Sequence, residues 1–86
     1  MSDLTSRFEA AAARVLQVKS MDNTKKLQLY GLFKQAKLGD CNVDRPGMMS
    51  FDATAKYKWD AWNQNKGMSQ EEAMEKYIQL VGPSST

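Results

Sequence analysis

The chain has 86 residues, of which 42% are hydrophobic and 26% charged, with a formal net charge of +2 at pH 7. This length predicts one domain over residues 1–86, and so small a charge argues against nucleic-acid binding through a broad basic surface. The sequence has one cysteine, Cys41, and no histidine, so we expect no disulfide, no metal site and no histidine-based catalysis. We expect no cofactor either. The N-terminus lacks a secretory pattern and no apolar run reaches about 20 residues, which predicts a cytoplasmic protein.

The first predicted helix spans residues 2–19. Its apolar side chains recur in steps of three and four, which is the spacing of one helical face: Leu4, Phe8, Ala11 or Ala12, Val15 and Val18. A short polar break follows at residues 20–23, where Asp22 or Asn23 is suited to cap the next helix.

The second predicted helix spans residues 22–38. Its apolar face comprises Leu29, Leu32, Phe33 and Ala36. Gly39 follows directly and is expected to end the helix in a left-handed conformation. Residues 39–50 contain Pro46-Gly47 and other turn formers, so they predict an ordered loop between two helices.

Two more helices complete the chain. The third spans residues 51–66, with Ala55, Trp59 and Trp62 on one face and Gly67 after its end. The fourth opens with Ser69 and Glu72 at capping-box spacing. Its apolar positions are Ala73 or Met74, Tyr77, Ile78 and Val81. No strand alternation is present, and the sequence predicts an all-α four-helix bundle.

Several side chains on these helices are suited to hold a ligand. Tyr30, Phe33 and Lys34 stand at i, i+3 and i+4, so they are neighbours on a helix surface. From the spacing alone, an amphipathic boundary between core and solvent is the preferred interpretation, and a binding patch is the alternative. Lys56 and Lys58 do not share a face, and a solvated surface is the simpler interpretation of Lys56.

The tryptophan pair and the methionine-containing loop also allow both a structural and a ligand-binding interpretation. Trp59 and Trp62 are interpreted mainly as core residues, with an edge available to a ligand groove. The segment from Arg45 to Met49 is either a rigid turn or a loop that receives an apolar ligand, because methionine adapts to irregular apolar surfaces.

Taken together, the sequence resembles the acyl-CoA-binding protein family over about residues 4–81. The stretches that carry the resemblance are YGLFKQAKLGD, NVDRPGM, KWDAWN and MSQEEAMEKYIQL, at residues 30–40, 42–48, 58–63 and 68–80. The resemblance implies an up-down-down-up bundle. It also implies a non-catalytic carrier that binds medium- and long-chain acyl-CoA esters for buffering and transport.

The resemblance also assigns contacts for the ligand. Tyr30 and Lys34 match the family's binding tyrosine and lysine, and Lys58 matches the lysine that meets the 3′-phosphate. The remaining nucleotide contacts implied by the family pattern are Phe33, Tyr77 and Ala12. For the acyl chain we expect an apolar lining that includes Met21, Leu27 and Met48.

Three departures from the family pattern bear on these assignments. The stretch between Phe51 and Trp59 is about two residues longer than the family pattern, which leaves the start of the third helix open. The register at Lys58-Trp59 matches the pattern, and Lys56 is the alternative residue for the phosphate. A lysine expected late in the first helix is replaced near Leu16, and the chain ends soon after Val81.

The expected partners are acyl-CoA esters, with transient contacts to membranes or acyl-CoA-using enzymes, and the expected state is a monomer. Two rival functions remain at this point. One is a helical interaction module that receives an amphipathic partner helix. The other is a thioester hydrolase, which the missing histidine and the lack of a nucleophile elbow disfavour.

Overall fold

The computed structural model describes residues 3–18, 20–42, 46–47 and 53–82. These residues contain four helices and no strand: α1 (Asp3–Val15), α2 (Asn23–Leu38), α3 (Ala53–Asn63) and α4 (Gln70–Val81). None of the described helices is long and apolar enough to cross a membrane.

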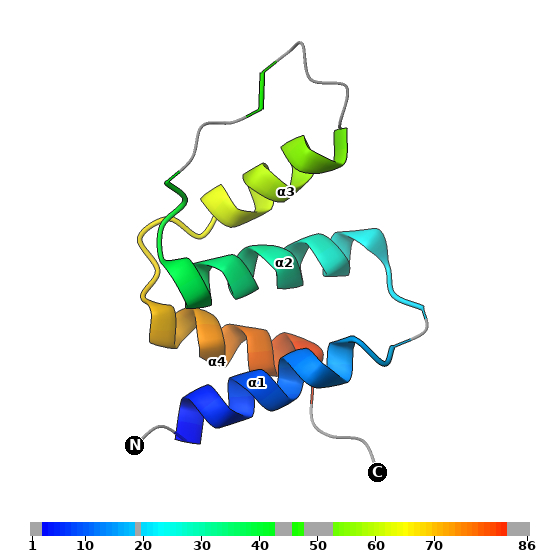
Figure 1. The fold of residues 1–86 in the computed structure, drawn as a ribbon, viewed down its shortest axis with the longest axis vertical. Coiled ribbons are helices and arrows are strands. Elements are labelled where there is room, and N and C mark those ends of the chain that lie inside the picture. The colour runs from blue at the N-terminus through cyan, green and yellow to red at the C-terminus, as the bar shows by residue number, and fades with distance from the viewer. Residues whose placement is uncertain (1–2, 19, 43–45, 48–52, 83–86) are drawn as a thin grey trace.

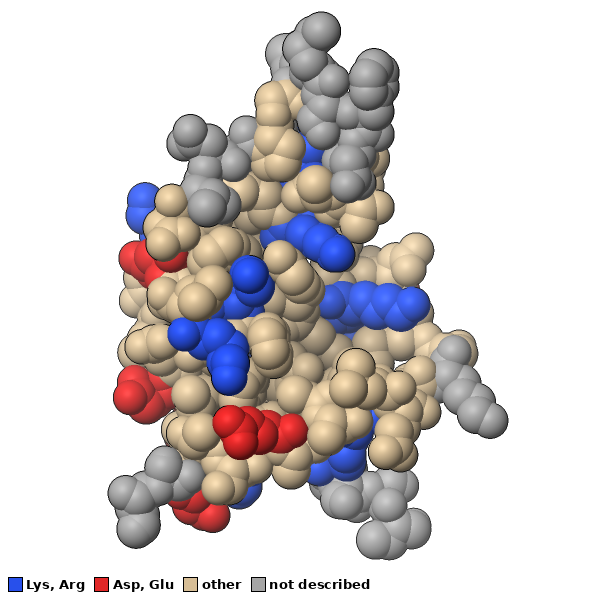
Figure 2. Space-filling model, viewed as in Figure 1, with Lys and Arg blue, Asp and Glu red and all other residues tan. Residues whose placement is uncertain are grey.

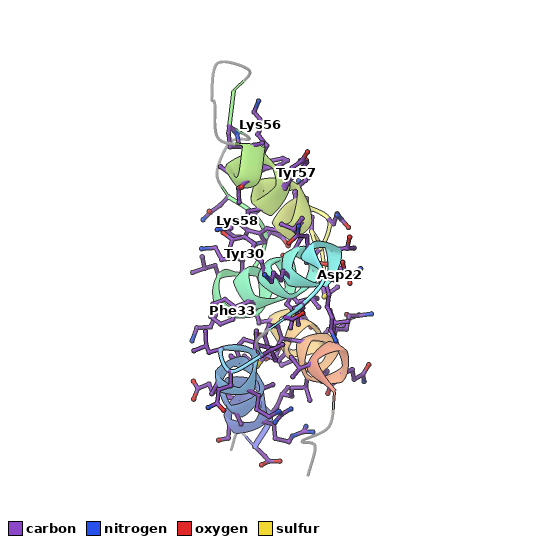
Figure 3. All side chains as sticks on the ribbon, turned by 90° about the vertical axis from the view of Figure 1, so that its right-hand side faces the viewer. Asp22, Tyr30, Phe33, Lys56, Tyr57 and Lys58 are labelled. Carbon is purple, nitrogen blue, oxygen red and sulfur yellow. The ribbon has the colours of Figure 1, made fainter. Side chains whose placement is uncertain are left out.

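α3, α2 and α4 lie side by side in that order as a layer, and α1 crosses α4 on one face of it (Figures 1 and 3). α2 packs on α3 and α4, and α1 packs on α4. The Cα positions extend over 45 × 30 × 14 Å. α1 and α4 run in one direction and α2 and α3 in the other, which confirms the predicted up-down-down-up topology.

The main core lies where α1, α2 and α4 meet. Its buried members are Phe8, Ala11, Leu29, Leu32, Ala36, Ala73 and Tyr77. The rings of Phe8 and Tyr77 meet edge to face with centroids 5.0 Å apart, and Phe33 lies 5.6 Å from Phe8. Aromatic pairs at these separations contribute beyond their buried area. The predicted apolar faces of these three helices are therefore confirmed at their centres.

The predicted end of the first helix is wrong. α1 ends at Val15, and the chain continues in tight turns in which the Gln17 and Val18 amides donate to carbonyls three residues earlier. Val18, expected in the apolar face, is 47% exposed, and Leu16 is 86% exposed. Because these two side chains stay exposed, burial does not favour a longer helix there.

The predicted end of the third helix is also wrong, by three residues. α3 ends at Asn63, after which the amides of Asn65 and Lys66 make three-residue turns that lead to Gly67. Gly67 has φ 92°, a left-handed conformation that glycine adopts without strain. The predicted beginning of this helix at Phe51 lies outside the described residues.

The predicted helix caps are confirmed in part. The Ser69 hydroxyl accepts a hydrogen bond from the Glu72 amide at 3.0 Å, which is half of the expected capping box. The Glu72 carboxylate lies 3.8 Å from Lys76 instead. Asp22 occupies the cap position of α2, but its side chain accepts no capping hydrogen bond.

α3 approaches α2 unusually closely at Gly31. A Cβ atom at this position would overlap the carbonyl oxygen of Ala61 and lie 2.6 Å from its carbonyl carbon. The contact is fixed further along the helix, where the Trp62 indole donates to the Gly39 carbonyl at 2.8 Å. Glycine in the interior of a helix is unfavourable by about 1 kcal/mol relative to alanine, so close packing is the physical reason for it here.

A hydrogen-bond network connects the turn between α3 and α4 to the end of α2. The fully buried Gln35 donates to the Asp40 carboxylate at 2.9 Å and to the Met68 carbonyl at 2.8 Å. The Gly67 amide donates to the same carboxylate oxygen at 2.8 Å. The pKa of Asp40 is lowered, mainly by the hydrogen bond from the Gly67 amide and next by the one from Gln35. Partial desolvation opposes this shift, and the charge of Lys66 adds to it.

The Asp40 carboxylate in this hydrogen-bond network predicts a loss of folding stability in acid. Because the folded-state pKa of Asp40 lies below its unfolded value of about 3.9, its contribution is present above that pH and lost as pH falls through the folded pKa. Asp40→Asn should therefore cost stability at pH 7 and less at pH 3. Urea unfolding of both proteins at the two pH values measures this, and an equal difference at both would contradict it.

Candidate functional site

Two lysines from different helices converge on one tyrosine ring. Tyr30 and Lys34 are one turn apart on α2, and Lys58 comes from α3. The Lys58 ammonium lies 5.3 Å from the Tyr30 ring centroid and the Lys34 ammonium 5.9 Å from it. Figure 3 shows Tyr30, Phe33 and Lys58 toward the same side of the helix layer. We call Tyr30, Lys34 and Lys58 the lysine cluster.

A second aromatic ring, that of Trp62, lies against the lysine cluster. The Lys34 ammonium also lies 5.1 Å from the ring of Trp62, which is buried in the contact between α2 and α3. Cation–π contacts of this length hold an ammonium in place without neutralising its charge. The cluster therefore brings two positive charges together at the surface, an arrangement that can bind a phosphate group.

An apolar groove of about 650 Å³ lies beside the lysine cluster, between α1, α2 and α4. Five residues expected to bind ligand line it, namely Ala12, Met21, Tyr30, Phe33 and Tyr77. The other lining residues are Ala13, Val15, Leu16, Val18, Lys26 and Leu29. Tyr30 belongs to both features, so a molecule in the groove can reach the two lysines.

The aromatic residues of the groove differ in how much they offer a ligand. Tyr77 is 4% exposed and belongs to the core, and burial raises the pKa of its hydroxyl. Phe33 is half-buried and presents part of its ring, and the Lys37 ammonium lies 6.0 Å from its centroid. Tyr30 is half-buried as well, so the groove combines a small apolar wall at Ala12 with two partly accessible rings, which suits a flat ligand.

The remaining predicted residues lie elsewhere. Leu27 is half-buried on α2 and does not line the groove, whereas Met21 shares it with the residues expected to contact the nucleotide. Met48 lies outside the described residues. Trp62 is buried, as expected, whereas Trp59 is only half-buried.

Lys56 stays apart from the lysine cluster. It is half-buried on α3, next to the exposed Tyr57, and Figure 3 places it nearer the start of that helix than Lys58. Lys58 makes the ring contact with Tyr30, and Lys56 makes none among the described residues.

Charge is unevenly distributed among the described helices. α2 carries Lys25, Lys26, Lys34 and Lys37 and no acidic residue, whereas α4 carries three glutamates and one lysine. Figure 2 shows basic side chains gathered over the middle of the face that is turned to the viewer. A positive potential of this kind attracts anionic ligands to the neighbouring groove.

Sequence patterns missed three contributors to this site. Gly31 allows α3 to bring Lys58 close to Tyr30, and its signal was a glycine inside a strongly predicted helix. Lys26 and Leu29 line the groove. Leu29 was expected in the core, but no periodicity indicates that a core residue also forms a groove wall.

A second groove, of about 500 Å³, lies between α2, α4 and the end of α3. Four of its nine lining residues carry carboxamides, namely Gln28, Gln64, Asn65 and Gln79, and four are apolar. None of the predicted ligand residues lines this groove. Lys76 is its one cationic lining residue. The groove beside the lysine cluster is therefore the better candidate for an anionic ligand with an apolar part.

Comparison with known proteins gives one consistent result. The sequence model described as acyl CoA binding protein matches residues 5–81. The chain is 44% identical over 79 residues to acyl-CoA-binding protein homolog 1 of Caenorhabditis elegans, with 91% of this chain and 90% of that protein covered. The Drosophila melanogaster acyl-CoA-binding protein homolog is 43% identical over 79 residues, with the same coverage.

Solved structures agree with the sequence comparisons. The crystal structure of Oryza sativa acyl-CoA-binding protein 2 superposes with a TM-score of 0.84 at 43% identity, covering 91% of this chain and 86% of that one. The crystal structure of the homologue from Moniliophthora perniciosa superposes with a TM-score of 0.80 at 39% identity, covering 93% and 76%.

Proposed function

Since this chain belongs to the acyl-CoA-binding protein family, we propose that it carries medium- and long-chain acyl-CoA esters and releases them unchanged. The family's members are named as binding proteins, not as enzymes. The observation that carries the proposal is the convergence of Lys34 and Lys58 on Tyr30, next to an apolar groove. Buffering and transport of acyl-CoA pools follow from reversible binding.

The lysine cluster is the proposed site for the phosphates of the CoA head group. Lys58 meets the 3′-phosphate, Lys34 binds beside it, and the Tyr30 hydroxyl supplies a hydrogen bond. The adenine ring occupies the groove against Ala12 and Phe33, with the edge of Tyr77 at its base. The groove volume of about 650 Å³ lies within the range of pockets that enclose small ligands.

The acyl chain is proposed to lie along a shallow apolar surface. Met21, Leu27 and Met48 are the residues assigned to it. Burying one methylene contributes about 0.8 kcal/mol, so roughly fifteen methylenes would supply about 12 kcal/mol if they were all enclosed. An 86-residue chain cannot enclose so long a tail and keep its core. Partial burial therefore grades affinity by chain length.

The head group is proposed to select the ligand class. Hydrogen bonds to charged groups contribute about 1.5–3 kcal/mol each, and association and ordering costs reduce the sum. Two lysines therefore supply enough energy to distinguish an acyl-CoA from a free fatty acid. We propose a monomeric carrier that works in the cytoplasm without a cofactor. Its proposed contacts with membranes or acyl-CoA-using enzymes are transient.

Comparison of three ligands tests the proposal. Palmitoyl-CoA is expected to bind at least a hundredfold more tightly than palmitate, because palmitate lacks the phosphates that two lysines would hold. Free CoA is expected to bind more weakly than palmitoyl-CoA because it lacks the tail. Isothermal titration calorimetry measures all three, and equal affinity for palmitate and palmitoyl-CoA would exclude the proposed site.

The same samples distinguish the two rival functions. A hydrolase would convert palmitoyl-CoA to palmitate and CoA, so the thioester should stay intact during a long incubation. An interaction module would need no acyl-CoA, so native mass spectrometry should detect a one-to-one complex with palmitoyl-CoA only under the carrier proposal.

A further inference from the structure

Two aliphatic side chains stand in solvent at the edge of the groove. Leu16 is 86% exposed and Val18 is 47% exposed, although both are large hydrophobic residues. Both line the groove, and both follow the end of α1 at Val15. We call Leu16 and Val18 the apolar lip.

The apolar lip differs from the other exposed hydrophobic side chains of the described residues. Leu38 is 56% exposed at the end of α2, and Tyr57 is 60% exposed on α3. Neither lines the groove. Among the exposed large hydrophobic side chains of the described residues, only the two of the lip line a candidate ligand site.

Charge beside the lip favours an anionic neighbour. Lys26 is exposed and lines the same groove, and it lies on α2, which has four lysines and no acidic residue. Asp22, exposed at the cap of α2, is the acidic residue nearby in sequence and reduces this charge in part. Aliphatic side chains next to lysine are the combination that binds at the interface of a bilayer with anionic lipids.

We propose that the apolar lip docks on the surface of an anionic lipid bilayer, with Leu16 and Val18 entering the interface and Lys26 facing the head groups. This orientation turns the mouth of the groove toward the lipid. The docking step needs no bound ligand. Its use in collecting or delivering an acyl-CoA rests on the proposed function.

The size of the lip favours a lipid surface over a second protein. A stable protein interface buries about 800 Å² on each partner, whereas the lip has two side chains. A bilayer interface accepts a few inserted aliphatic groups, because acyl chains adapt to their shape. Weak, reversible docking is what so small a surface can provide.

Vesicle flotation of the full-length chain without ligand tests the proposal. Vesicles of phosphatidylcholine with about 30% phosphatidylserine should bind the wild-type protein more strongly than phosphatidylcholine alone, since each lysine near the surface contributes about 1 kcal/mol. The double variant Leu16→Ser/Val18→Ser should lower the partition coefficient about tenfold or more, because both side chains would leave the apolar interface. Lys26→Gln should lower it several-fold.

Leu38→Ser is the matched control. It also removes an exposed leucine but lies away from the lip, so its partition coefficient should equal that of the wild type. Equal binding by the lip variant, or no vesicle binding by the wild type, would overturn the proposal. A dimer in analytical ultracentrifugation that depends on Leu16 without vesicle binding would overturn it too.

Calorimetric titration with palmitoyl-CoA in lipid-free solution separates the two proposals. If the wild-type protein binds palmitoyl-CoA but does not bind vesicles, the docking surface is refuted and the proposed function is not. Vesicle binding without palmitoyl-CoA binding would support the docking surface and refute the proposed ligand.

Discussion

Replacing both Lys34 and Lys58 by alanine is expected to weaken palmitoyl-CoA binding by at least a hundredfold. Each ammonium lies within 6 Å of the Tyr30 ring, so both would face the same phosphate-bearing part of the ligand. Contacts with charged groups contribute about 1.5–3 kcal/mol each, and 1.4 kcal/mol is a factor of ten in affinity. The single variants should each lose about tenfold or more, measured by calorimetric titration.

Lys56→Ala is the matched control for these variants. It removes the same charge from the same helix as Lys58→Ala, but its ammonium makes no contact with the Tyr30 ring among the described residues. Its affinity should change by no more than a few-fold. A larger loss for Lys56→Ala than for Lys58→Ala would reassign the 3′-phosphate, and wild-type affinity in the double variant would refute the site.

Gly31→Ala is expected to destabilise the protein, although alanine favours a helix over glycine by about 1 kcal/mol. The added methyl group would overlap the backbone of Ala61, and backbone cannot rotate away as a side chain can. Overpacking of this kind costs about 1–3 kcal/mol, which lowers the melting temperature of a domain of this size by about 5–20 °C. Thermal unfolding followed by circular dichroism measures the change.

The direction of the Gly31 effect is diagnostic, because helix propensity alone predicts a gain in stability. Gly47→Ala is its control, since a Cβ atom there meets nothing within 4 Å. If α3 moves outward to admit the methyl group, Lys58 moves away from Tyr30 and palmitoyl-CoA binding weakens as well. A melting temperature above that of the wild type would contradict the close contact.

Much of the fold could be predicted from local spacing. The apolar positions of α2 and α4 recur with helical period, and those at their centres are buried. The end of α1 could not be predicted, because Val18 continues the apolar spacing of that helix. Beyond Val15 the apolar side chains Leu16 and Val18 are exposed, so burial does not favour a longer helix there, and a single sequence does not show this.

The buried glutamine is a second feature that spacing could not reveal. Gln35 lies between the core residues Leu32 and Ala36, yet it is fully buried. Its amide finds acceptors in Asp40 and Met68, which are five and 33 residues away in sequence. A long-range partner decides whether a polar side chain is tolerated inside, and a single sequence carries no signal of it.

The candidate site was only partly predictable for the same reason. Helical spacing brings Tyr30 and Lys34 together, but Lys58 joins them through the crossing of α2 and α3. The choice between Lys56 and Lys58 therefore needed the geometry of that crossing. The resemblance to a family supplied the assignments, and they stay predictions until ligand binding is measured.

The position of α3 at one edge of the bundle means that a bound acyl-CoA would also stabilise the contact between α2 and α3. α3 lies at the edge of the layer, and α2 is its one packed helical neighbour among the described helices. A molecule held by Lys34 on α2 and Lys58 on α3 would tie the two sides of this seam together. By mass action, ligand at a hundred times its dissociation constant stabilises the bound form by about 2.7 kcal/mol. The loaded carrier would then detach its edge helix about a hundred times less often than the empty one.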